Sequence, residues 1–180
     1  MVKRRVLFKM SGSIACYKAC QIVSRLMQTG HEVQVACTRG ALQFIGEATL
    51  EGLTGRPVFS DTYERARMMD HIELGRWAEV AILCPATAHT LNRFAAGLGD
   101  DAVGSLFLAY DLAKKPYLIA PAMNQGMLQH PATREALGKL AAWGVRVISS
   151  EEGWQACGDI GPGRLAAPDF IYREIIEALK

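Results

Sequence analysis

The sequence predicts an α/β fold: one doubly wound, mostly parallel β-sheet with helices on both faces. Short apolar runs of strand length alternate with amphipathic segments of helix length along all 180 residues, which is the pattern of consecutive βα units. No repeat, linker or low-complexity stretch divides the chain. We therefore expect a single domain over 1–180 with one substantial hydrophobic core.

The composition is that of a globular protein with a small-molecule ligand. Hydrophobic residues make up 50% of the chain, and the formal net charge of +2 is too small and too scattered to favour nucleic acid or an anionic membrane. The chain shows no secretory signal pattern and no apolar run of membrane-spanning length. We expect a small anionic ligand, no nucleic-acid or membrane partner, and a cytoplasmic location.

The cysteines indicate a reducing compartment and no metal site. Their count of five is odd, and their spacing fits neither a metal site nor a redox pair. The four histidines form no ligand cluster with them, so we expect no metal. The cysteines are Cys16, Cys20, Cys37, Cys84 and Cys157.

The first strand, expected over 5–10, leads into a loop that suits a phosphate group. Ser11, Gly12 and Ser13 separate it from a helix expected over 14–29, and the start of a helix offers unpaired amides and positive dipole charge. The loop lacks the glycine pattern of dinucleotide sites and the lysine of P-loops, so a lone phosphate monoester, as in FMN, fits better. Serine is also the commonest helix cap, and capping alone explains the pattern equally well.

Thr38 and His71 are two further candidate site residues, and they lie toward opposite ends of their strands. The strand at 32–38 ends at Thr38, beside the end of the first strand. His71 lies in the connection that precedes the third strand, expected over 80–84. A lone histidine in such a connection more often serves at a surface or an interface than in catalysis.

Small residues follow the third strand in the segment 85–90 and allow a flat ring to approach the backbone. Thr87 and Thr90 in this segment either cap the next helix or bind a ligand. That helix is expected to end near Gly97, and further helices are expected over 41–53, 102–113, 130–143 and 169–179.

The apolar run 116–121 predicts a buried strand that stops at Pro121. Ligands of open α/β sheets bind beyond the carboxyl ends of the strands, so the segment after this strand is aimed at a site. It carries Asn124, whose amide can bind a carboxylate or a heterocycle edge at any pH, or can satisfy backbone groups of the turn.

A strand at 145–148 is followed by a glycine-rich stretch, 151–168, that has neither helical nor strand periodicity. We expect a loop of the kind that forms functional lids. Cys157 lies in its middle, where a cysteine is a poor core residue, so a chemical role is more credible for it than for the other four.

Five short motifs occur in the order found in the flavin-dependent cysteine decarboxylases, and the chain resembles this family over essentially its whole length. The motifs are Gly12-Ser13-Ile14-Ala15, His71-Ile72-Glu73-Leu74, Pro85-Ala86-Thr87-Ala88, Pro121-Ala122-Met123-Asn124 and Ala156-Cys157-Gly158-Asp159 with Gly161, Gly163 and Arg164. The resemblance implies a Rossmann-like, flavodoxin-like fold. It is strongest to the branch that acts on 4'-phosphopantothenoylcysteine, including the N-terminal part of bacterial bifunctional proteins.

The resemblance also implies residue roles. The loop at Ser11, Gly12 and Ser13, with Thr38, would hold the phosphate of FMN. Asn124, with its neighbours Ala122 and Met123, would bind the substrate and its carboxylate. His71 would be catalytic across a trimer interface, and Cys157 would lie on a flap over the substrate. The residues expected along the flavin are Pro85, Ala86, Thr87, Ala88 and Thr90.

The implied reaction is the FMN-dependent decarboxylation of 4'-phosphopantothenoylcysteine to 4'-phosphopantetheine in coenzyme A biosynthesis. Oxidation of the thiol to a thioaldehyde supplies an electron sink, carbon dioxide leaves, and the resulting enethiolate is protonated and reduced again. His71 would assist proton removal or orient the substrate, and Cys157 would supply the proton. Trimers or dodecamers with shared active sites are implied as well, and a ligase domain fused to such a chain is possible.

Some positions depart from the expected pattern. His89 replaces a usual Asn, which bears on affinity or substrate if that Asn touches the ligand. Arg93, Leu165 and Ala167 look like tolerated packing changes. Alternative functions are decarboxylation of a peptidyl cysteine as in lantibiotic maturation, a non-catalytic FMN-binding regulator, and a prenyl-transferring flavoprotein. Cys157 argues against the first, the joint presence of His71, Asn124 and Cys157 argues against the second, and the third would not need the Asn124 and Cys157 motifs.

Overall fold

The computed structural model, which describes residues 2–180, confirms the predicted fold class. Its main sheet has five parallel strands in the order β2-β1-β3-β4-β5, and Phe8 in β1 pairs with Val35 on one side and Ile82 on the other. This is the strand order of flavodoxin-like folds, in which the order reverses around β1. The strands are β1 Arg5–Met10, β2 Glu32–Cys37, β3 Val80–Ala86, β4 Tyr117–Pro121 and β5 Arg146–Val147.

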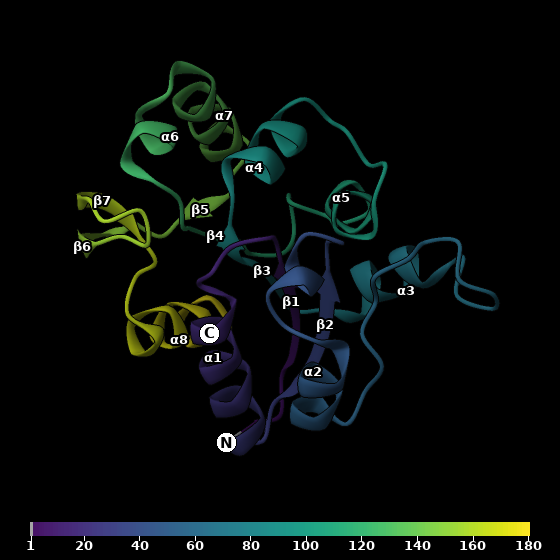
Figure 1. Ribbon diagram of the computed structural model, residues 1–180. Helices are drawn as coiled ribbons and strands as arrows, with labels where there is room; N and C mark the ends of the chain where they lie inside the picture. Colours follow the sequence, from purple (N-terminus) through teal and green to yellow (C-terminus); the bar gives the residue numbers. More distant parts are fainter. Residues whose placement is uncertain (1) are drawn as a thin grey trace.

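Helices cover both faces of the sheet and leave the central strands buried (Figure 1). One core joins the sheet to α1 Cys16–Gln28, α2 Glu47–Thr54 and α8 Pro168–Ala178. The other joins it to α3 Asp70–Trp77, α4 Ala88–Ala95, α5 Ala102–Leu108 and α7 Pro131–Ala142. Burial on both faces explains why these strands read as continuous apolar runs.

Several predicted boundaries shift, each for a local reason. The first helix begins at Cys16, so Ile14 and Ala15 belong to the preceding turn. The helix expected over 41–53 is interrupted by the extended Gly46, which separates a short 3₁₀ helix, Ala41–Gln43, from α2. The helix expected over 102–113 ends at Leu108, and a short helix that was not predicted, α6 Gln125–Gln129, follows β4.

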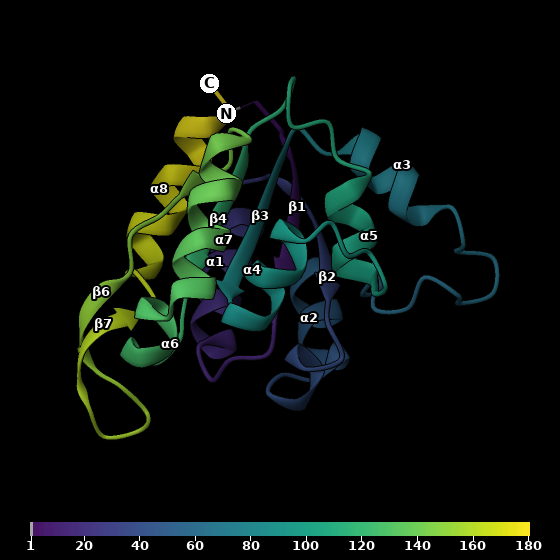
Figure 2. The same cartoon turned by 90° about the horizontal axis from the view of Figure 1, so that it is seen from above.

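The expectation of an irregular loop over 151–168 is wrong. This stretch forms an antiparallel hairpin of β6 Glu151–Trp154 and β7 Ile160–Arg164 (Figure 2). Its side chains give no strand pattern because the hairpin packs little apolar surface, and Trp154 and Ile160 are 68% and 75% exposed. Pairing of the backbone, rather than burial of an apolar face, makes these residues strands.

No helix within residues 2–180 combines the length and apolar character needed to cross a lipid bilayer.

Candidate functional site

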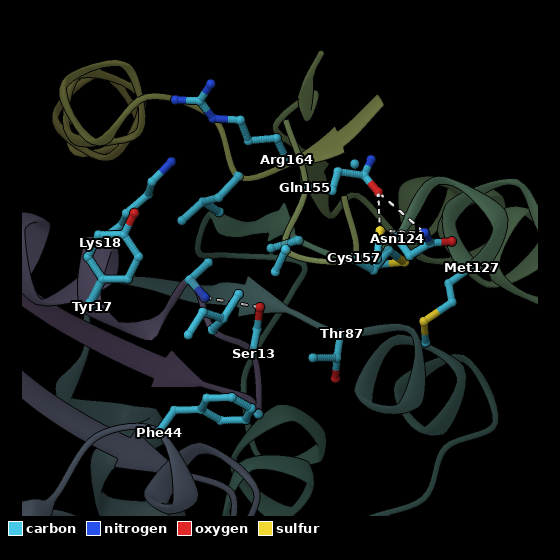
Figure 3. Close-up of a pocket in the computed structure, with 18 of the residues that line it drawn as sticks. Ser13, Tyr17, Lys18, Phe44, Thr87, Asn124, Met127, Gln155, Cys157 and Arg164 are labelled. Atoms are coloured by element: carbon cyan, nitrogen blue, oxygen red, sulfur yellow. Dashed lines mark hydrogen bonds between the residues drawn. The ribbon is translucent and has the colours of Figure 1, made fainter. Parts of the chain in front are cut away.

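A pocket of about 720 Å³ opens beyond the carboxyl ends of the central strands, between the β1–α1 loop and the β6–β7 hairpin (Figure 3). Its volume is typical of small-molecule sites, and its place next to β1 is where doubly wound sheets bind ligands. The sequence-predicted residues that line it are Gly12, Ser13, Thr87, Ala122, Met123, Asn124 and Cys157.

The β1–α1 loop is shaped by a close approach of two backbones. A Cβ atom on Gly12 would lie 2.8 Å from the carbonyl carbon of Gly40, so only glycine fits at this position. The amides of Gly12, Ser13 and Ile14 donate no hydrogen bond to the rest of the chain over residues 2–180. Three free amides at the start of α1 form a site suited to an anion.

Ser11 lies beneath this loop rather than in the pocket. Its buried hydroxyl donates to the carbonyl oxygen of Pro85 at 2.8 Å and accepts from the amide of Thr87 at 2.9 Å. Ser11 therefore ties the end of β1 to the end of β3 and fixes Thr87, whose own side chain faces the pocket and caps α4. Direct contact between Ser11 and a phosphate stays a prediction.

The remaining predicted cofactor residues do not line the pocket. Thr38 is 9% exposed, and its hydroxyl accepts from the amide of Ala41 at 3.1 Å. Thr90 is buried, with its hydroxyl 3.3 Å from that of Thr87. Also absent from the pocket lining are Pro85 and Ala86, which end β3, and Ala88, which begins α4.

Asn124 and Cys157 meet at one end of the pocket, although 33 positions separate them. The Nδ2 amide of Asn124 donates to the Cys157 Sγ at 3.2 Å and to Asp159 Oδ2 at 3.3 Å, and the thiol donates to the same Asp159 oxygen at 3.3 Å. Asn124 Oδ1 caps α6 by accepting from the Gly126 amide at 2.7 Å. The amide hydrogens of Asn124 and the thiol of Cys157 thus face the same space.

The buried side chain of Gln155 holds this arrangement in place. Its Oε1 accepts from Asn124 Nδ2 at 3.4 Å and from the Gln125 amide at 3.2 Å, while its Nε2 donates to the Pro162 carbonyl at 2.7 Å. The sequence reasoning missed Gln155, because a glutamine in a glycine-rich stretch carries no signal except its nearness to Cys157. Other pocket residues that were missed are Tyr17, Lys18, Phe44 and Met127, and Arg164 was named only as part of a motif, without a role.

The hairpin is docked onto the end of β4 by its glycines. The amide of Met123 donates to the Gly163 carbonyl at 2.9 Å. Gly163 has a φ of +121°, and a Cβ there would lie 2.2 Å from the Met123 oxygen. A Cβ on Gly161 would overlap the side chain of Gln125 at 2.0 Å. A side chain at Gly163 would therefore push the hairpin, and Cys157 with it, away from Asn124, whereas at Gly161 the flexible end of Gln125 would have to move.

His71 is not brought to this pocket. It lies in the first turn of α3, near the β2 edge of the sheet, whereas the hairpin lies near the β5 edge (Figure 1). The sequence reasoning placed it in a connection, and the structure places it on a helix. Its Nδ1 atom is buried without a hydrogen-bond partner in residues 2–180. Buried nitrogens without a hydrogen-bond partner are uncommon in proteins.

The pocket fits a flavin mononucleotide in chemistry and size. The free amides at Gly12, Ser13 and Ile14 match a phosphate, and Thr87 and Ala122 offer a surface without bulk for a planar ring. No group of three or more His, Cys, Asp or Glu side chains in the described residues is arranged to hold a metal ion.

Comparison with known proteins gives one consistent answer. The model of the Flavoprotein family matches residues 1–180. The coenzyme A biosynthesis bifunctional protein CoaBC of Vibrio parahaemolyticus is 41% identical over 167 residues, which cover 92% of this chain and 41% of that protein. The chain thus spans about two fifths of the length of such relatives.

Solved structures agree with this match. A mutant PPC decarboxylase complexed with pantothenoylaminoethenethiol superposes with a TM-score of 0.87 at 31% identity, with 98% of both chains covered. The FMN binding protein AtHal3 gives a TM-score of 0.85 at 32% identity over 98% of this chain and 96% of its own. The chain belongs to the Flavoprotein family.

Proposed function

We propose that this protein catalyses the FMN-dependent decarboxylation of 4'-phosphopantothenoylcysteine to 4'-phosphopantetheine in coenzyme A biosynthesis. The observation that carries the proposal is the 3.2 Å contact between the Asn124 amide and the Cys157 thiol, in the same pocket as the free amides of the β1–α1 loop. The names of the relatives, CoaBC and PPC decarboxylase, support the substrate, and an FMN binding protein among the structural neighbours supports the cofactor.

FMN would be held by the β1–α1 loop and would supply the two-electron acceptor for oxidation of the substrate thiol to a thioaldehyde, which can take up the electron pair left when carbon dioxide departs. Asn124 binds the substrate carboxylate through its neutral amide. A cation there would stabilise the negative charge of the bound substrate, and this stabilisation would be lost in the transition state as carbon dioxide forms; a neutral amide avoids that loss. Cys157 donates a proton to the carbon chain left after carbon dioxide departs. Ala122 and Met123 form the wall that keeps the substrate between Asn124 and the flavin site.

We also propose that the active site is shared between copies of the chain, in a trimer or a larger assembly of trimers. His71 would act in the pocket of a neighbouring copy, by assisting proton removal or by orienting the substrate. Support comes from its place near the β2 edge of the sheet, away from the hairpin within one chain. The large apolar side chains just before α3 are exposed, as expected for a surface that meets another copy: Tyr63 84%, Met68 62% and Met69 60%.

The activity is assigned to the part of the bifunctional relatives that this chain matches. We propose that 1–180 forms one decarboxylase domain with residues 151–168 as its flap, and that it acts in the cytoplasm. The two cores of one continuous sheet support the single domain, and five free thiols support a reducing compartment.

Mass spectrometry of the FMN-loaded protein with 4'-phosphopantothenoylcysteine tests the proposal. The expected product is the substrate less one carbon dioxide, and the purified protein is expected to be yellow and to release FMN on denaturation. A protein that takes up no FMN would overturn the cofactor assignment. A flavin-loaded protein that decarboxylates only peptides ending in cysteine would overturn the substrate assignment.

A further inference from the structure

Two basic side chains face each other at the end of the pocket opposite to Asn124 and Cys157. Lys18 projects from the first turn of α1, and Arg164 is the last residue of β7. Both line the pocket (Figure 3), where they lie on the opposite side from Asn124 and Met127. The pocket therefore has one end that carries an amide and a thiol and another end that carries two cations.

Neither cation has a counter-ion that satisfies it. Over residues 2–180, no carboxylate lies within salt-bridge distance of Lys18 or Arg164. Glu151 is the acidic group of this region, and its Oε1 accepts from the amide of Ala167 at 2.7 Å. Burial and the nearby Arg164 lower the pKa of Lys18, against the opposite effect of Glu151. Two like charges that approach each other without a partner are stabilised when an anion binds between them.

We propose that Lys18 and Arg164 bind the phosphate group at the far end of the substrate and select the phosphorylated substrate over its unphosphorylated form. The inference rests on the proposed function and deepens it. The substrate is a linear molecule with its reacting cysteine at one end and a phosphate monoester at the other, and the pocket presents matching groups at its two ends. The rest of the pocket lining is largely apolar and includes Tyr17 and Leu165, as suits the hydrocarbon part of the substrate.

FMN carries a phosphate as well, but the structure offers it a different place. The free amides at Gly12, Ser13 and Ile14 lie at the start of α1, whereas the ammonium group of Lys18 points from the helix toward Arg164 (Figure 3). Substitution of the two side chains should therefore weaken binding of a phosphate held by the cations without weakening binding of a phosphate held by the backbone amides.

The test uses the FMN-loaded protein and the variants Lys18→Gln, Arg164→Gln and the double variant. Isothermal titration calorimetry, with every protein also carrying His71→Asn so that the titrated compound is not consumed, gives the Kd for 4'-phosphopantothenoylcysteine and for pantothenoylcysteine, and absorbance gives the FMN content. For the phosphorylated compound, each single variant is expected to raise the Kd by about tenfold or more, the effect of losing one charge-assisted hydrogen bond. The Kd for pantothenoylcysteine and the FMN content are expected to stay as in the wild type.

Lys114→Gln and Arg173→Gln serve as matched controls, because both side chains are exposed and lie outside the pocket. Two outcomes would overturn the inference. The first is an unchanged preference of the double variant for the phosphorylated compound. The second is a loss of FMN that accounts for the whole effect, which would assign the cations to the phosphate of FMN. Failure of the proposed function is a separate result, seen as tight binding of either compound by the wild type without release of carbon dioxide.

Discussion

Two serines that are close neighbours in sequence play different parts, and only the structure separates them. The hydroxyl of Ser11 is buried between Pro85 and Thr87, whereas Ser13 lines the pocket, where its Oγ accepts from the Ala15 amide at 3.2 Å. From the sequence, both flank a glycine before a helix and look alike. We therefore expect Ser11 to serve mainly the scaffold and Ser13 to contact the ligand.

Substitution of each serine by alanine tests this assignment. Ser11→Ala leaves the partly buried Thr87 amide without its acceptor, and the free energy of unfolding is expected to fall by about 1–3 kcal/mol. Ser13→Ala is expected to weaken FMN binding while changing stability far less. Urea unfolding of the apoprotein and titration with FMN measure the two effects, and equal losses of stability in both variants would contradict the assignment.

Lys9 is an unusual core residue that the strand pattern did not reveal. It is fully buried among Phe94, Phe107 and Tyr117, and its ammonium nitrogen lies 4.4 Å from the centre of the Tyr117 ring without a hydrogen-bond partner in the described residues. Burial lowers the pKa of Lys9 well below its ordinary value of 10.5, with a smaller opposite effect of Asp101. Contact with the ring faces offsets only part of that cost.

Lys9→Met is expected to raise the free energy of unfolding at neutral pH by about 1–3 kcal/mol, because it removes a buried polar group of similar length. Between the lowered native pKa and the ordinary pKa of lysine, the unfolded chain binds a proton that the native state does not, so wild-type stability rises with pH in that window. The advantage of the variant should therefore shrink as pH rises toward the ordinary lysine pKa of 10.5. Chemical denaturation at a series of pH values from neutral to alkaline measures it, and an advantage that grows with pH would refute the explanation.

At the scale of elements, the parallel sheet was predictable and the hairpin was not. Strands such as β1 and β3 are buried on both faces, so their apolar runs reveal them. The β6–β7 hairpin is specified by backbone contacts, among them the bond from the Met123 amide to the Gly163 carbonyl, which leave no period in the side chains. A local pattern cannot report a contact between segments that lie so far apart in the chain.

Gly163→Ala is expected to displace the hairpin, because the new methyl group would meet the Met123 oxygen and an alanine resists a φ of +121°. Decarboxylation should fall by about tenfold or more as Cys157 moves from Asn124. Hydrogen exchange at the Met123 amide should speed up at the same time. Gly158→Ala is the control, since Gly158 also has a positive φ, +94°, but no atom within 4 Å of its Cβ position. Equal effects of the two variants would show that docking of the hairpin is not the cause.

At the scale of the whole molecule, one chain gathers only part of the predicted site. The family resemblance, rather than periodicity, placed Asn124 and Cys157 at one substrate, and the structure brings the two side chains together. His71 could not be placed from the periodicity of its own segment, and within one chain it remains away from them. A residue that completes a neighbour's site leaves no trace in the pattern of its own chain.

Mixing two variants that each fail to form the fully reduced product tests whether the site is shared. His71→Asn and Cys157→Ser each lack one residue, and after subunit exchange about a quarter of the sites in a random assembly would combine both intact residues. We expect the fully reduced product to appear in the mixture at a corresponding fraction of the wild-type rate. If each site is built from one chain, the mixture will form no more of this product than the separate variants do.

The central claim is that this pocket decarboxylates a cysteine and that the Cys157 thiol then supplies a proton. Mass spectrometry of the product formed from 4'-phosphopantothenoylcysteine by the Cys157→Ser variant tests it most directly. We predict a decarboxylated product that lacks two hydrogens relative to 4'-phosphopantetheine, because without the proton the enethiolate cannot be reduced again. Formation of 4'-phosphopantetheine by this variant at the wild-type rate would contradict the account.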